Sequence, residues 1–240
     1  MTLLGVDWSQ YYGGIGLGLL RTVEFTAVSY VGAILLGAVV AIGRTQKIAA
    51  VRRLAGAYVE VVKNVPLLTW IFVLYFGLPS VGIRLSGFIA GSLALILFYG
   101  SYIGEVFRGG LQGVGAGQRE AAHSMGLSSW QGYRYVVLPQ ALRLALAGTG
   151  TMLVDLIKAT SLLVTIAGRE LMTQGQVITS VTFKALQVYL VIGALYFLLC
   201  YPTSQSVLWL ERHLGRGQPL SLKRRHWLAI ARALQSNGTR

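Results

Sequence analysis

The chain has 240 residues, of which 54% are hydrophobic and only 12% are charged, and its mean hydropathy is +0.61. Soluble globular proteins carry about 25% charged residues, so this composition excludes a water-soluble globular domain and indicates that lipid surrounds much of the chain. The formal net charge of +13 would suit a nucleic-acid partner, unless the basic residues serve to orient the chain in a membrane.

The opening stretch, MTLLGVDWSQYYGG, has no basic residue at its start and carries Asp7. A secretory signal peptide begins with a positively charged region, so we expect no cleavable signal here. The first spanning helix would then direct insertion of the chain into the membrane.

Five apolar segments are long enough to predict membrane-spanning helices, which need roughly 20 apolar residues each. They cover residues 20–43, 58–78, 86–108, 139–159 and 183–208. An odd number of spans places the two termini on opposite sides of the membrane. We therefore predict an all-α, polytopic membrane bundle over residues 1–213, followed by a basic tail over residues 214–240.

The basic residues divide unequally between the two sides that this topology defines. Sixteen of the 21 Lys and Arg residues lie in the loop after the first span and the start of the second, around the loop after the third span, and in the tail. Because cytoplasmic loops carry an excess of Lys and Arg, we predict an external N-terminus and a cytoplasmic C-terminus. The charge thus has a role in topology, and we expect no nucleic-acid partner.

Two spans carry signals for packing or pairing. Arg21 and Glu24 lie three residues apart near the start of the first span, a spacing that permits an ion pair on one helix face. Gly100 and Gly104 form a small-xxx-small pair in the third span, which permits close contact between helices.

A half-polar stretch, EAAHSMGLSSWQGYRYVVLPQALR over residues 120–143, interrupts the apolar sequence between the third and fourth spans. We expect one helix over residues 118–125, ended by Gly126 in a left-handed conformation. Ser128 and Gln131 have the spacing of a capping box and predict the start of a second short helix. Pro139 suits the first turn of the next span.

The residues of this loop leave two interpretations open. It could be an amphipathic segment held at the membrane surface by Trp130, Tyr133 and Tyr135, or a docking element for a cytoplasmic partner. Connections between helices are usually only a handful of residues long, so the length of the loop requires a reason that a simple connection does not supply.

The loop has a distinctive spacing: Glu120-Ala121-Ala122, three residues, Gly126, nine residues, and then Val136-x-Leu138-Pro139. This resembles the EAA loop of ATP-binding-cassette (ABC) importer permeases, EAA-x3-G-x9-I-x-LP, with valine in place of isoleucine. Further stretches resemble the polar amino acid permeases of the glutamine, histidine and glutamate type, and together they extend the resemblance over residues 18–213. These stretches are YVE and NVPLL near residues 58–68, YIGEVFRGG at 102–110, GQ at 117–118, LPQALR at 138–143 and KATSL at 158–162.

The resemblance implies a permease subunit of an ABC importer for polar amino acids, with the fold of a type I importer transmembrane domain in a bacterial inner membrane. It implies two ABC ATPase subunits, a second permease subunit (a copy or a paralogue), an extracytoplasmic solute-binding protein, an amino acid substrate and membrane lipid as partners. It also implies that the first short helix of the loop seats in a groove of the ATPase, with Ala121 and Ala122 keeping the contact face small. The residues that match the coupling element are Glu120, Ala121, Ala122, Gly126, Leu138 and Pro139.

We expect no enzymatic activity from this chain. It has no phosphate-binding G-x-x-x-x-G-K-[ST] sequence, so ATP and magnesium would bind to a partner subunit and this chain would hold no cofactor. The one cysteine, Cys200, and three scattered histidines give no metal-binding or catalytic pattern. No catalytic residue or metal ligand is therefore predicted.

Ionisable groups at membrane depth are costly and are candidates for the substrate path. The resemblance and this cost together single out Glu105, Asp155, Lys158, Thr160 and Ser161. Ala159 stands where the related permeases carry an acidic residue, which favours neutral or acidic substrates over arginine or lysine. Two alternatives stay open: Asp155, one turn earlier, could restore the missing charge, or it could pair with Lys158. Ala159 could equally face lipid or a neighbouring helix, and the substrate pocket could lie in the other permease subunit.

A self-contained secondary amino acid transporter or a channel is the alternative function. Five spans without an internal repeat are few for an alternating-access carrier, and such a carrier would leave the long cytoplasmic loop without a role. Dependence on a separate ATPase distinguishes the two.

Overall fold

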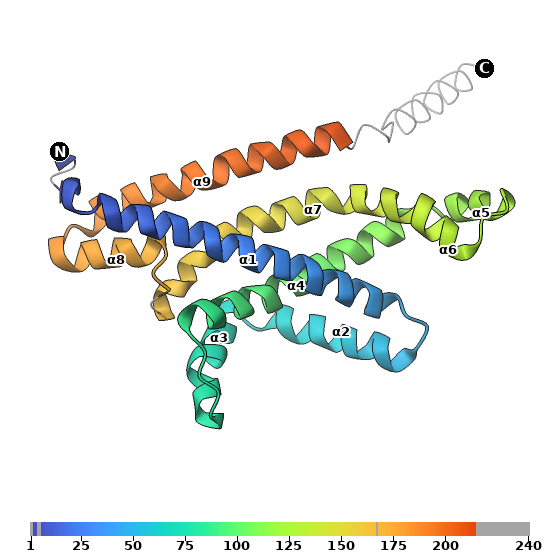
Figure 1. The fold of residues 1–240 in the computed structure, drawn as a ribbon, viewed down its shortest axis with the longest axis horizontal. Helices are drawn as coiled ribbons and strands as arrows, with labels where there is room; N and C mark the ends of the chain where they lie inside the picture. The colour runs from blue at the N-terminus through green and yellow to red at the C-terminus, as the bar shows by residue number, and fades with distance from the viewer. Residues whose placement is uncertain (1, 4–5, 167, 215–240) are drawn as a thin grey trace, which may run out of the picture.

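Helices make up nearly all of the computed structural model of the chain, which describes residues 2–3, 6–166 and 168–214 (Figure 1). The α-helices are α1 (Tyr12–Thr45), α2 (Ala49–Asn64), α3 (Leu67–Phe72), α4 (Gly87–Gly113), α5 (Ala116–Ser124), α6 (Ser129–Gln131), α7 (Leu138–Ala159), α8 (Leu171–Thr182) and α9 (Ala185–Leu214). Short 3-10 or π-helical segments adjoin them: η1 (Trp8–Gln10), η2 (Val73–Gly77), η3 (Leu78–Val81), η4 (Gly132–Val137) and η5 (Thr160–Ile166). Of the predicted basic tail, residues 215–240 lie outside the described residues.

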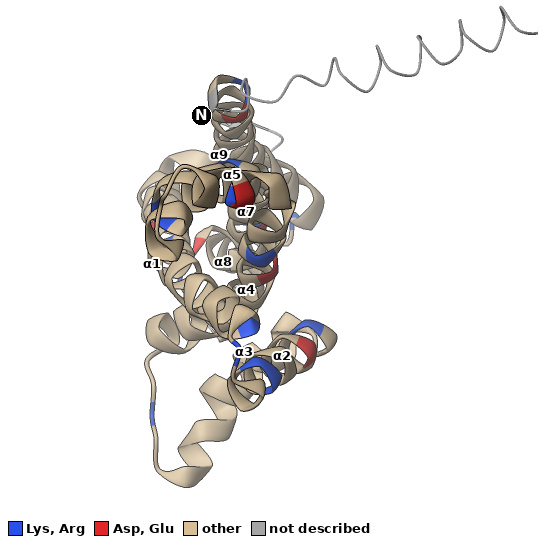
Figure 2. Cartoon of the chain, turned by 90° about the vertical axis from the view of Figure 1, so that its right-hand side faces the viewer, with Lys and Arg blue, Asp and Glu red and all other residues tan. Residues whose placement is uncertain are grey.

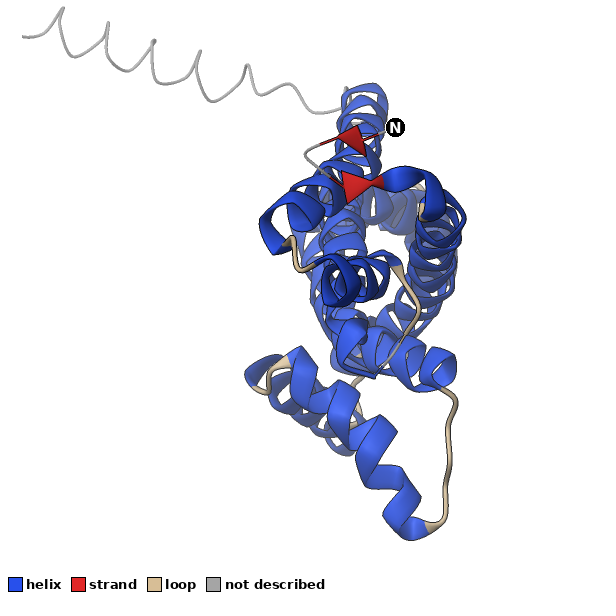
Figure 3. Ribbon diagram, turned by 90° about the vertical axis from the view of Figure 1, so that its left-hand side faces the viewer, coloured by secondary structure: helices blue, strands red, loops and turns tan. Residues whose placement is uncertain are grey.

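A two-stranded antiparallel hairpin precedes the first helix. Its strands, β1 (Thr2–Leu3) and β2 (Val6–Asp7), pair with Leu3 opposite Val6. Figure 3 shows how small these strands are beside the helices. The described part of the chain therefore confirms the predicted all-α class.

The predicted spans correspond to helices that are long and apolar enough to cross a membrane. Four of these segments are 12–45, 87–113, 129–166 and 185–213, and the fifth is a bent pair of helices over 49–64 and 67–81. The segment over residues 129–166 joins α6, η4, α7 and η5 without a break. The sequence led us to expect a separate second short helix before Pro139, but α6 continues directly into the span.

The second span is broken, and the prediction of a continuous helix over residues 58–78 was wrong. The axes of its two parts differ by 103°, and in Figure 1 α3 points away from the other long helices. Val65 and Pro66 adopt extended backbone angles at the break. Proline has no N–H to donate and disfavours helix in the residue before it, so Pro66 accounts for the bend.

Glycines bring α1 and α4 into close contact. A Cβ atom added to Gly37 of α1 would lie 2.7 Å from Ile103 Cγ2 and 3.0 Å from the backbone nitrogen of Gly104. A Cβ added to Gly100 would lie 2.8 Å from a methyl carbon of Leu36. The Gly100–Gly104 pair thus has the packing role that its spacing predicted.

The main hydrophobic core lies where α1, α3, α4, α7 and η5 meet, and Phe25, Ile71, Leu95, Leu156 and Leu163 are buried there. The two ends of the long axis differ in what they carry (Figure 1). One end, called here the α8 end, holds the N-terminal hairpin, α8 and the start of α9. The other, called the α5 end, holds α5, α6 and the ends of α1 and α4.

Candidate functional site

The interrupting loop forms a well-defined hairpin of helices at the α5 end. Gly126 has a φ of +79°, and the backbone N–H groups of Gly126 and Leu127 donate to the carbonyl oxygens of His123 (2.9 Å) and Ala122 (3.1 Å). This is the glycine-terminated helix end known as the Schellman motif. Because the left-handed region disfavours side chains with a Cβ, Gly126 accounts for the sharp turn between α5 and α6, as predicted.

The second helix of the loop begins with the predicted capping box. Ser128 Oγ accepts a hydrogen bond from Gln131 N at 3.3 Å, and the Ser128 N–H donates to Gln131 Oε1 at 2.9 Å. Two backbone N–H groups at the start of α6 are thereby satisfied locally. The loop thus holds its own shape with short-range contacts.

The side chains of the loop divide into an inner and an outer set. Ala122 is buried, 2% exposed, and packs toward Gly132, whereas Ala121 is exposed. The expectation that Ala121 and Ala122 share one outward face is therefore wrong, since consecutive residues on a helix point about 100° apart. Glu120 is exposed, and its carboxylate makes no hydrogen bond or ion pair with the described residues.

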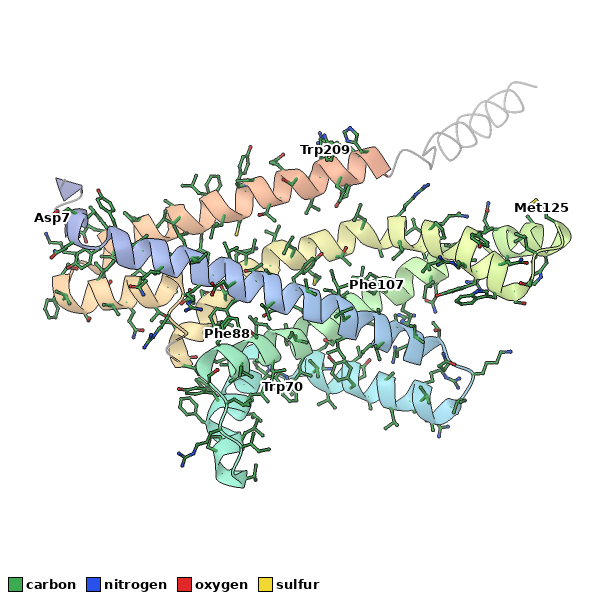
Figure 4. The ribbon with its side chains drawn as sticks, in the orientation of Figure 1. Asp7, Trp70, Phe88, Phe107, Met125 and Trp209 are labelled. Atoms are coloured by element: carbon green, nitrogen blue, oxygen red, sulfur yellow. The ribbon has the colours of Figure 1, made fainter. Side chains whose placement is uncertain are left out.

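Aromatic and hydrophobic residues connect the loop to the next span. Trp130 and Tyr135 are 68% and 67% exposed, and the Trp130 ring stacks on Tyr133 with centroids 6.1 Å apart. Leu138 is half-buried at the start of α7, and Pro139 is exposed in its first turn. In Figure 4 the labelled Met125 marks how far the loop projects beyond the other helices.

A second polar group lies farther along α7, at an exposed position beside α4. Lys158 Nζ lies 3.7 Å from Asp155 Oδ1, and the Tyr99 hydroxyl of α4 donates to Asp155 Oδ2 at 3.0 Å. The Asp155 and Lys158 side chains are 56% and 59% exposed. An exposed ion pair on a helix long and apolar enough to span a membrane requires water or a partner, because lipid solvates charge poorly.

The hydroxyl groups next to this ion pair differ in how accessible they are to a ligand. Ser161 is half-buried and donates to the Lys158 carbonyl oxygen at 2.7 Å, while Thr160 is fully buried and donates to Ile157 O. Ala159 packs against the main hydrophobic core. Of the predicted path residues, Asp155, Lys158 and Ser161 therefore lie together, and Thr160 is directed into the bundle.

Glu105 belongs to a different group, nearer the α5 end. Its carboxylate accepts hydrogen bonds from Arg108 Nε at 3.0 and 3.1 Å and from Arg108 Nη2 at 2.6 Å. Arg44 Nε of α1 lies 3.2 Å from Glu105 Oε1. Glu105 is thus paired with two guanidinium groups and joins the ends of α1 and α4. Sequence reasoning counted Arg44 only as a topology signal and missed this pairing.

Sequence reasoning also missed Glu170 at the α8 end. Its side chain is fully buried and accepts hydrogen bonds from the N–H groups of Met172 (2.7 Å) and Thr173 (2.8 Å), and from the Tyr196 hydroxyl (2.7 Å). Burial raises the pKa of the Glu170 carboxyl above its ordinary value, although these hydrogen bonds act in the opposite direction. An acidic residue directly before an apolar helix is a capping signal, but its burial depends on α9, which the sequence does not reveal.

The described residues contain no cluster of three or more His, Cys, Asp or Glu side chains that could hold a metal ion. The candidate site has three parts: the exposed helix α5, the exposed Asp155–Lys158 pair on α7, and the Glu105 carboxylate with its two arginine partners. It can bind a polar solute or another protein.

Comparisons with known proteins agree on one family. Residues 33–216 match the family model described as binding-protein-dependent transport system inner membrane component. The probable glutamine ABC transporter permease protein of Bacillus subtilis (strain 168) is 36% identical, over 90% of this chain and 98% of that protein. The glutamine transport system permease protein of Escherichia coli (strain K12) is 31% identical, over 87% of this chain and 97% of its own length.

A solved structure has the same fold. A crystal structure of an amino acid ABC transporter with histidines contains a chain that matches with a TM-score of 0.82 and 30% identity. The match covers 87% of this chain and 99% of that one. The helix arrangement described above is therefore shared with a membrane chain of an amino acid ABC transporter.

Proposed function

The chain belongs to the family of binding-protein-dependent transport system inner membrane components, the permease subunits of ABC importers, and from this premise we propose that it imports polar amino acids. It contributes the translocation path and couples to a separate cytoplasmic ATPase. The observation that carries the proposal is the stretch of residues 116–139, whose exposed helix α5 suits a partner and whose spacing matches the EAA element. A secondary transporter would need no such element.

The loop is placed to transmit force. It directly connects the end of α4 to the continuous helical segment that contains α7, so a displacement of α5 acts on two spans at once. Gly126 and the capping box make the connection stiff, and a stiff element converts motion of one subunit into rotation of packed helices. Ala121 and Glu120 present the surface that meets the ATPase, and Ala122, Leu138 and Pro139 fix this surface to the bundle.

ATP hydrolysis occurs on the partner. The sequence has no phosphate-binding loop with the required lysine, which supports a permease that binds no nucleotide, magnesium or other cofactor. Two ATPase subunits, one for each permease, suit an importer built as a pair.

The substrate path passes the polar pair of α7. Asp155 and Lys158 carry opposite charges that complement the ammonium and carboxylate groups of a zwitterionic amino acid, and Ser161 adds a hydroxyl beside them. Glu105 is already neutralised by Arg44 and Arg108, so it offers little attraction to a cationic side chain. These contacts support neutral or acidic amino acids as cargo over arginine or lysine.

A second permease subunit, either a copy or a paralogue, covers the arm formed by α3, η2 and η3. This arm is bent by 103° from α2 and exposes apolar side chains, with Phe76 59% and Val81 70% exposed. An arm within the bilayer that exposes such a surface suits contact with a second bundle. The solute-binding protein would dock at the α8 end. The excess of Lys and Arg toward the other end supports an orientation with the α8 end outside the cell and the C-terminus in the cytoplasm.

Uptake measurements test the proposal. The chain would be reconstituted in proteoliposomes with its ATPase and solute-binding protein, and a panel of radiolabelled amino acids would be offered. We expect ATP-dependent uptake of a neutral or acidic amino acid that disappears when the ATPase is omitted. Uptake that persists without the ATPase, driven by an ion gradient, would contradict the proposal in favour of a secondary transporter.

A further inference from the structure

A basic cavity of about 580 Å³ lies at the α5 end, where α1, α4, α5, α6 and η4 meet. Figure 2 looks at this end of the molecule and shows α1, α4, α5 and α7 around its centre. Arg44, Arg119 and His123 line the cavity, and the other lining residues are uncharged, among them Gln112 and Tyr133. A cavity with this lining attracts an anion.

The basic side chains that line this cavity have hydrogen-bond donors without an acceptor among the described residues. Arg119 Nη2 donates to the Leu111 carbonyl oxygen at 3.1 Å, which holds the guanidinium against the end of α4. Arg44 Nε lies 3.2 Å from Glu105 Oε1, and its two terminal nitrogens make no hydrogen bond to the described residues. The His123 ring likewise has no partner within the described part of the chain. Several N–H groups therefore remain available at one place.

An apolar groove continues from this cavity. The groove has a volume of about 240 Å³ and lies between α1, α4 and the start of α7, with Ala38, Ile42 and Phe107 in its walls. Phe107 is labelled in Figure 4. Leu111 and Tyr133 line both the cavity and the groove, so the two are adjoining. A basic mouth followed by an apolar groove has the polarity of a phospholipid.

We propose that the cavity and the groove together bind one anionic phospholipid. The headgroup phosphate lies among Arg44, Arg119 and His123, and one acyl chain lies in the groove along Ala38 of α1. Exposed Trp130 and Tyr135 beside the cavity place it at the level of the lipid headgroups, where such side chains concentrate. Basic pockets between membrane helices on the cytoplasmic side favour anionic headgroups, and the groove selects a lipid over a free anion.

Native mass spectrometry of the full chain tests this site. Delipidated protein would be incubated separately with phosphatidylglycerol, phosphatidylcholine and inorganic phosphate. We expect retained phosphatidylglycerol, little phosphatidylcholine and no stable phosphate adduct. Removal of one cation by Arg119→Gln should weaken phosphatidylglycerol binding about fivefold, whereas Arg53→Gln, at an exposed arginine of α2 outside the cavity, should leave it unchanged.

A second pair of variants tests the groove. Ala38→Phe fills the groove and should reduce lipid retention, whereas Val39→Phe places the same ring at a neighbouring position that is 65% exposed and outside it. Arg119→Gln also removes the hydrogen bond to Leu111 and could disturb the loop. His123→Glu keeps that hydrogen bond, and it should still weaken lipid binding because it places a negative charge in the cavity.

Three results would overturn the proposal. Equal retention of phosphatidylglycerol and phosphatidylcholine would remove the role of the cations. An equal loss of phosphatidylglycerol binding in Arg53→Gln and Arg119→Gln would mean that the overall surface charge, and not the cavity, attracts the lipid. Inorganic phosphate that binds wild type and Ala38→Phe equally, without lipid retention, would indicate a free-anion site.

Discussion

The two ends of the molecule differ in the burial and hydrogen bonding of a glutamate side chain. At the α8 end, Glu170 is fully buried and accepts hydrogen bonds from two backbone N–H groups and from the Tyr196 hydroxyl. At the α5 end, Glu120 is exposed and its carboxylate has no partner among the described residues. Under the proposed function, the buried Glu170 holds the α8 end rigid, and the exposed Glu120 leaves a carboxylate available to the ATPase.

The ends also differ in the range of the contacts that shape them. Contacts between distant segments hold the α8 end together, such as the hydrogen bond from the Leu171 N–H to Thr22 Oγ1 at 3.2 Å. The loop at the α5 end is shaped mainly by contacts within a few residues, at Gly126 and Ser128. Substitutions at the α8 end should therefore change stability, and substitutions at the α5 end should change transport.

The largest expected effect on stability is that of Glu170→Ala. The change removes the cap of α8 and leaves the Tyr196 hydroxyl without its acceptor. Loss of a cap costs about 1 kcal/mol, and an unsatisfied buried group costs about 1–3 kcal/mol. We expect a clear drop in the thermal unfolding temperature, whereas Glu120→Ala should leave that temperature nearly unchanged. Equal effects of the two substitutions would remove the contrast between the ends.

The pH dependence of stability sharpens the same contrast. Because the pKa of Glu170 is raised in the folded state, ionisation of this carboxyl is less favourable in the folded chain than in the unfolded one. Its contribution to stability is therefore greatest below the unfolded pKa and declines as the pH rises through the folded pKa. Glu170→Gln should lack this decline in thermal unfolding measured over a pH series, and a decline of the same size in the variant would assign it to another group.

The next largest effect on stability is expected from a substitution in the packed pair α1 and α4, which joins the two ends. Gly37→Leu places a side chain where a Cβ already approaches Ile103 and Gly104 closely, and overpacking of this kind costs about 1–3 kcal/mol. Gly16→Leu on the same helix has no atom within 4 Å of the added Cβ and is the matched control. A similar thermal shift in both variants would mean that close packing of α1 on α4 contributes little.

Gly126→Val should affect the α5 end alone. A residue with a Cβ in the left-handed region costs about 1–2 kcal/mol, which is enough to shift the preferred geometry of the loop. We expect a strong loss of ATP-dependent uptake with only a small change in the unfolding temperature. Gly117→Val, in α5 with an ordinary backbone and open space around it, should transport normally; failure of both variants alike would show that bulk alone is harmful.

The smallest expected effect on stability is that of Asp155→Asn. Both partners of its ion pair are more than half exposed, and exposed pairs contribute about 0–1 kcal/mol. A substrate role predicts instead a several-fold rise in the KM for uptake. Glu24→Gln disrupts the pair with Arg21, which has the same spacing and lies toward the α8 end, and it should not change KM. An unchanged KM in Asp155→Asn would remove the ion pair from the path.

The sequence predicted what depends on neighbouring residues. The capping box at Ser128, the left-handed Gly126 and the Arg21–Glu24 pair at 2.7 Å all follow from spacings of five residues or fewer. The resemblance added the family and the likeness of the loop to an EAA element. The described spans also lie near the predicted ones, because hydropathy reports the lipid around each helix.

What could not be predicted depends on contacts between distant segments. Arg44 and Glu105 are 61 positions apart in the sequence, and Glu170 and Tyr196 meet only because α8 packs on α9. The break at Pro66 had a local signal, since proline follows Asn64-Val65, but the apolar run across it favoured one continuous helix. The inward orientation of Ala122 required knowledge of where Gly132 lies.

The most direct test of the coupling role of α5 is ATP-dependent amino acid uptake by Glu120→Lys in the reconstituted complex. Glu60→Lys, at an exposed glutamate of α2 outside the loop, is the matched control. Reversal of charge on the exposed face of α5 should abolish uptake while the chain still inserts and folds, and the control should transport as wild type does. Uptake by Glu120→Lys at the wild-type rate would contradict the account, because the loop would then be a surface feature without a part in coupling.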